Sequence, residues 1–118
     1  MIKFWLIVLV VVSTVGGLVF IGLRPCYRQG QLVAARINVR ETRDRFRGFV
    51  ASRRRCPAPG EVKVSRDPWG QPLVITCPGR FDPQGADVVS SGRDRRRGTA
   101  DDIESWTLAC KGGACGPR

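Results

Sequence analysis

The sequence predicts an α+β protein in which one long N-terminal helix, partly transmembrane, packs on a small antiparallel β-sheet. Residues 4–23 form an uncharged apolar run, and the charged segment after it repeats apolar residues at helical spacing. Beyond Gly60, short apolar segments alternate with turn-forming residues, a pattern typical of strands. These observations divide the chain into a short tail at residues 1–3, a transmembrane helix at 4–23, an amphipathic helix at 24–56 and a small β-region at 57–118.

The composition argues against several classes of function. The chain has 118 residues, with 20 Lys and Arg against 10 Asp and Glu, so its formal net charge is +10, and it contains no histidine. Without histidine there is no imidazole general base and no histidine-ligated metal. Because no serine or cysteine has an obvious base in its sequence context, we expect that the protein is not an enzyme.

The apolar run is long enough to cross a membrane. About 20 residues, at roughly 1.5 Å each, span the ~30 Å hydrocarbon core of a bilayer as a helix. A cleaved secretory signal is the alternative, but its apolar region usually has ~7–15 residues and ends in a small-x-small site. The residues at the end of the run, Gly22-Leu23-Arg24, do not form such a site cleanly. We therefore expect an uncleaved single-span anchor.

Charge and cysteine content point to opposite orientations of this anchor. Lys3 precedes the run and Arg24 and Arg28 follow it, so the charge count alone could place the C-terminal side in the cytoplasm. However, five cysteines without histidine and without a CxxC pair fit disulfides better than zinc or redox chemistry. Because disulfides persist outside the cytoplasm, we expect the C-terminal domain on the extracytoplasmic side.

The segment after the anchor predicts an amphipathic helix over residues 27–55. A second, shorter apolar patch at Val33 and Ile37 lies on another face and is a candidate subunit contact. Pro25 predicts a kink or an interruption between the two helical stretches, and the Pro- and Gly-containing residues 56–60 end the helix. The main apolar stripe consists of Leu32, Ala35, Val39, Thr42, Phe46 and Phe49.

The β-region contains four candidate strands. A turn at Asp67-Pro68-Trp69-Gly70 separates the first two, and a polar loop from Ser91 to Asp102 separates the last two. The candidate strands are Glu61–Val64, Leu73–Cys77, Asp87–Ser90 and Thr107–Cys110.

Four of the five cysteines form two candidate disulfide pairs. A bridge between Cys56, at the helix end, and Cys77, at a strand end, would tie helix to sheet and contribute roughly 3 kcal/mol to stability. Cys110 and Cys115 could close a small terminal loop. Cys26 is then left over, either free or cross-linking two copies. If the domain faced the cytoplasm instead, all five would be free thiols.

The strongly basic charge also raises the possibility of nucleic-acid binding. Phosphate binding needs a continuous cationic patch with exposed aromatic side chains beside it. The arginine triplets at residues 53–55 and 95–97 are far apart in the sequence, and the tryptophans are scattered. We therefore expect no nucleic-acid partner.

Three motifs together resemble a known family. They are DPWGQP at residues 67–72, GADVVSSGRD at 85–94 and GTADDI at 98–103. In this order and spacing they are similar to the C-terminal half of the major, G-type pseudopilin of type II secretion systems. The resemblance implies a pilin-like fold and a structural role in a pseudopilus-like assembly. It also implies a bacterial inner-membrane location with a periplasmic domain, and partners among other pseudopilin or secretion-system subunits, including the chain itself.

The same resemblance implies a calcium-binding loop. Asp94, Asp101 and Asp102 match the acidic positions of the family motif, and Ser91 with its neighbours would supply backbone carbonyl oxygens. Calcium takes six to eight oxygen ligands, which a short loop with several carboxylates can provide.

Two departures from the family pattern leave alternatives open. Arginines 93 and 95–97 crowd the loop, so its aspartates could simply form turns and cap backbone amides. The opening residues, MIKFWL, show none of the family's basic leader, glycine cleavage site or acidic residue. The alternative function is therefore a stand-alone membrane-anchored pilin-like binding module that does not polymerise.

Overall fold

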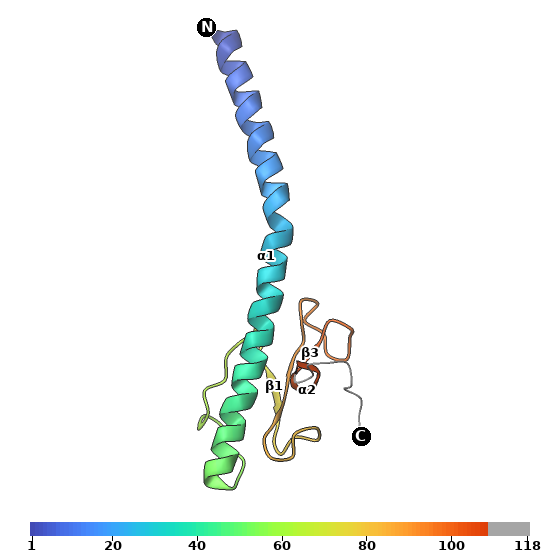
Figure 1. The fold of residues 1–118 in the computed structure, drawn as a ribbon. Coiled ribbons are helices and arrows are strands. Elements are labelled where there is room, and N and C mark those ends of the chain that lie inside the picture. Colours follow the sequence, from blue (N-terminus) through green and yellow to red (C-terminus); the bar gives the residue numbers. More distant parts are fainter. Residues whose placement is uncertain (109–118) are drawn as a thin grey trace. The chain divides into compact units, whose positions relative to one another are not determined.

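The computed structural model describes residues 1–108 and consists of two compact units (Figure 1). The first unit comprises residues 1–31, and the second begins at Leu32. A single long helix contributes to both units. The elements in chain order are α1 (Ile2–Arg53), β1 (Val74–Thr76), β2 (Asp87–Ser90), β3 (Ile103–Glu104) and α2 (Ser105–Leu108).

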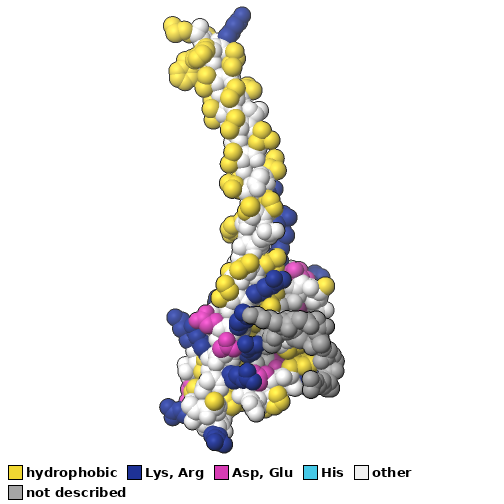
Figure 2. Space-filling view, viewed as in Figure 1, with side chains coloured by type: hydrophobic (Ala, Val, Ile, Leu, Met, Phe, Trp, Pro, Cys, Tyr) yellow, Lys and Arg dark blue, Asp and Glu magenta, His cyan; other side chains and the backbone are white. Residues whose placement is uncertain are grey.

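The first unit is the N-terminal part of α1. It includes a stretch that is long and apolar enough to cross a membrane, and its large hydrophobic side chains are exposed. On the face shown in Figure 2, most of the side chains of this part of α1 are hydrophobic. Of the kink or interruption expected at Pro25, the interruption is not observed, because α1 continues through this residue. Proline removes one backbone hydrogen bond, and the bonds of the flanking turns maintain the helix.

In the second unit, α1 buries the predicted apolar stripe. Four of its six positions are buried, which confirms that this face of α1 packs on the rest of the unit. The other two differ: Leu32 is 36% exposed and Phe49 is half-buried. The helix ends after Arg53, where Arg54 takes a left-handed conformation with φ of 57°. The buried positions are Ala35, Val39, Thr42 and Phe46.

The sheet has three antiparallel strands in the order β1-β2-β3. Val89 in the central strand pairs with Val74 on one side and with Glu104 on the other. Two of the predicted strands are confirmed, Asp87–Ser90 at its predicted bounds and Leu73–Cys77 in a shorter form. The α+β class with a long helix and a small antiparallel sheet is therefore confirmed.

The prediction of a strand at Glu61–Val64 is wrong. Glu61 closes a turn, in which its backbone amide donates to the Ala58 carbonyl at 3.0 Å. Farther along, α1 side chains satisfy the segment's carbonyl groups: Arg45 donates to the Lys63 carbonyl oxygen at 3.2 Å. Asn38 likewise donates to a later carbonyl, at residue 66. The Lys63 carbonyl therefore pairs with the helix, and the first β-bridge of this region is an isolated one between Arg66 and Pro72.

The predicted fourth strand is also wrong where the structure describes it. Thr107 and Leu108 belong to the short helix α2, while residues 109 and 110 lie outside the described part of the chain. The strand that pairs with β2 on this side is β3, which lies a few residues earlier. Because β3 already pairs with this edge of β2, the residues after Glu104 turn into a helix.

The core lies between the second half of α1 and the sheet. Buried aliphatic residues from both layers form one cluster, with partly buried Trp69, Ile75 and Leu108 packed against it. The cluster connects α1 to all three strands or to the segments beside them. Its fully buried members are Ala35, Val39, Leu73, Val88 and Ile103.

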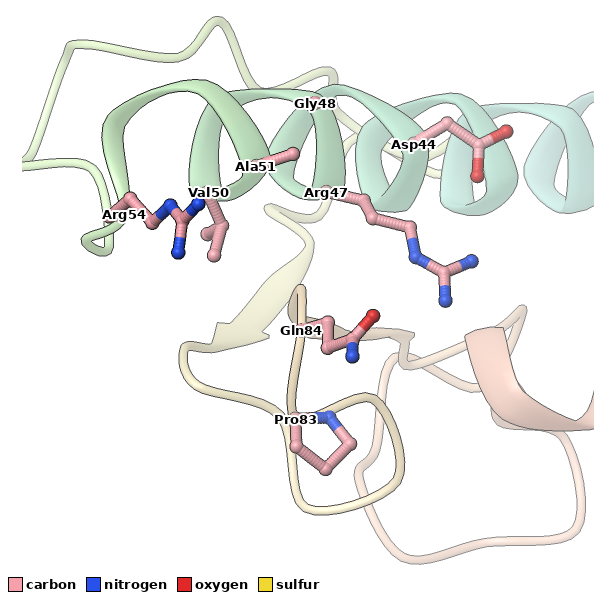
Figure 3. A pocket seen from close by; sticks show the side chains of 8 residues that line it. All are labelled: Asp44, Arg47, Gly48, Val50, Ala51, Arg54, Pro83 and Gln84. Atoms are coloured by element: carbon pink, nitrogen blue, oxygen red, sulfur yellow. The ribbon is translucent and has the colours of Figure 1, made fainter.

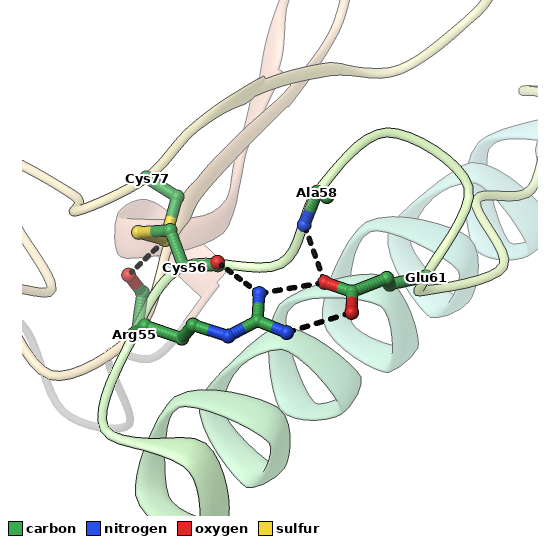
Figure 4. Close-up of a disulfide and its surroundings, with 6 residues drawn as sticks. Arg55, Cys56, Ala58, Glu61 and Cys77 are labelled. Carbon is green, nitrogen blue, oxygen red and sulfur yellow. Dashed lines mark hydrogen bonds and ion pairs between the residues drawn. A yellow bond between two sulfur atoms is a disulfide. The ribbon is translucent and has the colours of Figure 1, made fainter.

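A disulfide joins Cys56 to Cys77, so the bridge considered from the sequence between helix end and strand end is present (Figure 4). Beside it, the guanidinium of Arg55 donates two hydrogen bonds to the carboxylate of Glu61, at 2.7 and 2.8 Å. The Ala58 backbone amide adds a third donor to that carboxylate. Together these contacts shape the turn that follows α1.

Candidate functional site

The site begins with a buried carboxylate in the turn before β1. Asp67 Oδ1 accepts hydrogen bonds from the backbone amides of Trp69, at 3.1 Å, and Gln71, at 2.8 Å. Its Oδ2 accepts a 2.9 Å bond from the hydroxyl of Ser90 at the end of β2. Asp67 therefore shapes its own turn and also connects the first sequence motif to the second.

A second buried carboxylate organises the loop between β1 and β2. Asp87 accepts hydrogen bonds from the consecutive backbone amides of Arg80, Phe81 and Asp82, at 2.6 to 3.2 Å. Gly79 is pressed against it, because a Cβ there would lie 2.5 Å from Asp87 Oδ1. Asp87 lies in a strand as expected, but its role as an acceptor was not predicted, although an acid within the strand pattern DVVS was a usable signal.

The two ends of the polar loop, residues 91–102, lie in close contact. Gly92 has a φ of 68°, and a Cβ added there would lie 2.1 Å from the carbonyl oxygen of Asp101. The Gly92 amide also donates to the Ser90 hydroxyl at 3.3 Å. Only glycine combines this backbone conformation with so close an approach, so the loop is closed at its base by the same serine that binds Asp67.

The three candidate calcium ligands lie in this loop, and each binds backbone amides within it. Asp94 Oδ1 accepts from the Arg96 amide at 2.9 Å, and Asp101 Oδ2 accepts from the amide of Asp94 at 2.8 Å. Asp102 Oδ2 accepts from the Gly98 amide at 2.8 Å. The Arg96 amide, followed by the Thr99 hydroxyl, lowers the pKa of Asp94 below its ordinary value. This is the turn-forming and capping role considered from the sequence.

The loop contains the oxygen ligands that calcium prefers, but its acidic side chains do not meet at one point. Carboxylate and carbonyl oxygens are the ligands that calcium prefers, and Asp94 and Asp101 each use one of their two carboxylate oxygens in these amide bonds. Ser91 lies buried at the loop base. Within residues 1–108, however, no group of three or more acidic, cysteine or histidine side chains is close enough to hold a metal. Calcium binding would therefore require these side chains to move closer together.

The loop arginines do not pair with these carboxylates. Arginines 93 and 95–97 are exposed, and in the described part of the chain none of them forms an ion pair. Arg95 has a left-handed backbone with φ of 60°, a conformation that favours glycine. The carboxylates of the loop thus bind its backbone amides, and its guanidinium groups lie in solvent.

The candidate subunit contact is exposed. Val33 and Ile37 are 54% and 57% exposed in the second unit. A shallow surface hollow begins beside Ile37 and continues along α1 past charged residues. Large aliphatic side chains in water at neighbouring positions of one helix face provide apolar surface that a partner could cover.

An open groove lies between the end of α1 and the loop before β2 (Figure 3). Two of its charged residues form ion pairs, Asp44 with Arg43 at 2.7 Å and Arg47 with Asp82 at 3.7 Å. The arrangement contains no nucleophile beside a base. The lining residues are Asp44, Arg47, Gly48, Val50, Ala51, Arg54, Pro83 and Gln84.

The remaining cysteines divide between the described and undescribed parts of the chain. Cys26 is a free, exposed thiol in the first unit. The second candidate bridge, Cys110 to Cys115, lies outside the described residues.

Comparison with known proteins identifies similar sequences in one family. Residues 50–106 match the family described as Type II secretion system (T2SS), protein G. The chain is 41% identical over 46 residues to the type II secretion system core protein G of Aeromonas hydrophila, covering 39% of this chain and 31% of that protein. It is 39% identical over 56 residues to the Klebsiella michiganensis core protein G, covering 47% and 38% of the two chains.

The match is partial in every case. Identity to the core protein G of Escherichia coli K12 is 42% over 49 residues, which covers 42% of this chain and 32% of the relative. The matched segments thus span about a third of the length of these relatives. No solved structure matches the chain significantly.

Proposed function

From the match of residues 50–106 to the type II secretion system protein G family, we propose that this chain is a membrane-anchored structural subunit or accessory of a type II secretion pseudopilus-like assembly. The observation that carries the proposal is that the residues matched by the family are connected to one another in the structure. The matched region contains both the Asp67–Ser90 bond and the Gly92–Asp101 contact that close the loop. The role is structural and not catalytic, in keeping with the relatives, which are named as core proteins of a secretion system.

Anchoring by the N-terminal helix supports this proposal. The hydrophobic side chains of the apolar stretch are exposed on all sides of the helix, as they are in a lipid-facing helix. Its two hydroxyl side chains bond within the helix: Ser13 donates to the Leu9 carbonyl at 2.8 Å and Thr14 to the Val10 carbonyl at 3.0 Å. These polar groups therefore need no water in the hydrocarbon layer.

We place the C-terminal domain on the periplasmic side of the bacterial inner membrane, with a single span. The support is the Cys56–Cys77 disulfide, which requires an oxidising compartment. In the cytoplasm thiols are kept reduced, and the turn after α1 would lose its covalent link to the sheet.

The partners would be other pseudopilin or secretion-system subunits, or further copies of this chain. Val33 and Ile37 are the contact we propose, because covering these exposed aliphatic groups removes apolar surface from water. The flanking Arg40, Glu41 and Arg45 would form a polar rim around the contact.

Calcium is the cofactor we propose for the polar loop. Asp94, Asp101 and Asp102 would hold it together with backbone carbonyl oxygens near Ser91. The ion would bind the two ends of the loop together, where Gly92 already brings them into contact. Its contribution would be structural stabilisation.

A stand-alone anchored module is the second candidate. The observation that favours it is the apolar run at residues 4–23, which contains no acidic side chain. Such a protein would retain the fold and the anchor without joining a filament.

Photo-cross-linking in cells that contain the secretion machinery tests the proposal. A photoreactive amino acid at Ile37 is expected to give adducts with a second copy or with another secretion subunit. The matched control is the same group at Val64, which is 40% exposed and lies off the helix patch. Adducts at position 37 alone support the assembly role. Monomer only at both positions would instead establish the stand-alone module.

A further inference from the structure

We propose that Arg24, Tyr27 and Arg28 form a binding site for the phosphate headgroup of an anionic phospholipid, an inference that rests on the membrane anchoring proposed above. The ligand is a lipid of the leaflet on the side of the C-terminal domain. All three residues belong to the first unit.

The position of the two arginines along α1 matches the headgroup layer. The apolar run ends at Leu23, and Arg24 and Arg28 follow it by one and five residues. At roughly 1.5 Å per residue they lie about 2 to 8 Å beyond the hydrocarbon boundary. The headgroup region on each side of a bilayer is about 5 to 8 Å thick, so both guanidinium groups reach phosphates and not acyl chains.

The helix brings the cationic groups together on one face. Residues four apart are neighbours on a helix surface, and the structure has a concavity lined by Arg24, Arg28, Tyr27, Phe20 and Leu23. Its lining is apolar toward the run and cationic beyond it. This is the arrangement that an acyl chain with a charged headgroup needs.

The arginines are available for an anion. Arg24 lies over the ring of Phe20, with its Cζ atom 4.6 Å from the ring centroid, a contact that orients the guanidinium without neutralising it. The sequence has no acidic residue before Glu41, so no carboxylate on the neighbouring turns competes for the site. The planar guanidinium binds phosphate oxygens in a bidentate manner, which a neutral polar residue cannot do.

A lipid site at this position is also compatible with the proposed topology. Positive residues flanking a span favour the cytoplasmic side. If the disulfide-containing domain is periplasmic, Arg24 and Arg28 also lie on the periplasmic side. Their positive charge then disfavours this orientation of the helix. Binding of an anionic lipid offsets part of this cost, because the negative charge of its phosphate partly neutralises the two guanidinium groups.

Lipid selectivity of the full-length chain in vesicles tests the site. The probes are spin-labelled phosphatidylglycerol and phosphatidylcholine, whose motionally restricted fractions report association with the protein surface. Wild type is expected to prefer phosphatidylglycerol, by roughly fivefold per arginine at low salt. The double variant Arg24→Gln, Arg28→Gln is expected to lose this preference. Arg36→Gln, which removes an exposed arginine farther along the chain, is the matched control and should retain it.

Flotation with vesicles of pure phosphatidylcholine separates this inference from the proposed anchor. A chain that floats with neutral vesicles but shows no lipid preference overturns the headgroup site and leaves the anchor intact. An equal loss in Arg36→Gln and in the double variant also overturns it, because the attraction would then come from diffuse charge. A chain that does not float overturns the anchor, and the site with it.

Discussion

The hydroxyl of Ser90 donates a 2.9 Å hydrogen bond to the buried carboxylate of Asp67, 23 positions earlier in the chain. Asp67 is 4% exposed and Ser90 is fully buried. The bond joins the turn before β1 to the end of the central strand, and the loop that carries the candidate calcium ligands starts directly after it. The buried pair is therefore the base on which that loop is built.

Removing the Ser90 hydroxyl should destabilise the second unit. In Ser90→Ala the Asp67 carboxylate keeps its two backbone donors but loses the hydroxyl, and an unsatisfied buried acceptor costs about 1–3 kcal/mol. The measurement is urea unfolding of the full-length chain in detergent micelles, followed by tryptophan fluorescence. Ser52→Ala, which removes an exposed hydroxyl that bonds only within α1, is the control. Equal unfolding midpoints for the two variants would contradict the role of the pair.

Glycine 92 should tolerate substitution less well than Gly98. Both have positive φ, of 68° and 80°, so alanine at either position has a backbone cost of about 1–2 kcal/mol. Only at position 92 does the added Cβ also meet the Asp101 carbonyl oxygen, at 2.1 Å, whereas nothing lies within 4 Å at position 98. Thermal melts should show a clearly larger loss for Gly92→Ala. An equal loss of stability in both variants would mean that the Asp101 carbonyl moves aside for the added Cβ without destabilising the loop.

Loss of the disulfide should lower the free energy of unfolding by roughly 3 kcal/mol in the chain-entropy model. The pair Cys56→Ser, Cys77→Ser removes a bridge with a sequence separation of 21. Cys26→Ser, which removes the free thiol, should leave stability unchanged. Urea midpoints under oxidising conditions measure both effects, and a reducing agent should bring wild type to the value of the double variant.

Acid should weaken the turn after α1. Hydrogen bonds from Arg55 and then from the Ala58 amide lower the pKa of Glu61 from 4.5 to about 2. Because the folded-state value lies below the unfolded one, the stabilisation is fully present above about pH 4.5 and is lost as the pH falls toward 2. The effect should be small, since both side chains are partly exposed.

The variant Glu61→Gln isolates this contribution. It should unfold with a weaker dependence on pH between 4.5 and 2 than wild type does, and with an unchanged dependence at higher pH. Chemical denaturation at a series of pH values measures the difference. Parallel curves over the acidic range would show that the Arg55–Glu61 pair does not contribute.

Calcium should raise the melting temperature if the loop binds it. An ion at about 100 times its dissociation constant adds about 2.7 kcal/mol, a rise on the order of 10 °C for a small domain. Replacing Asp94 or Asp102 by Asn should abolish the rise, whereas Asp44→Asn, at an exposed acid on α1, should preserve it. No rise in wild type would mean that the aspartates serve only the backbone amides that they bind here.

Local patterns in the sequence were enough to predict most of the elements. The buried face of α1 followed from the helical spacing of Ala35, Val39 and Phe46, and β2 followed from the apolar pair in DVVS. These predictions succeeded because side-chain periodicity is set by the geometry of one element alone. Recognition of the family likewise depended on short motifs with fixed spacing, which the comparison then matched over residues 50–106.

Contacts between distant segments could not be predicted in this way. The segment at Glu61–Val64 alternates like a strand, but its backbone bonds to α1 side chains such as Arg45. Asp67 and Asp87 lie in a predicted turn and a predicted strand, and the partners of their buried carboxylates depend on which amides and hydroxyls the fold brings to them. A buried charge is stable only with such partners, and those partners are supplied by the packing of the helix, the turns and the sheet.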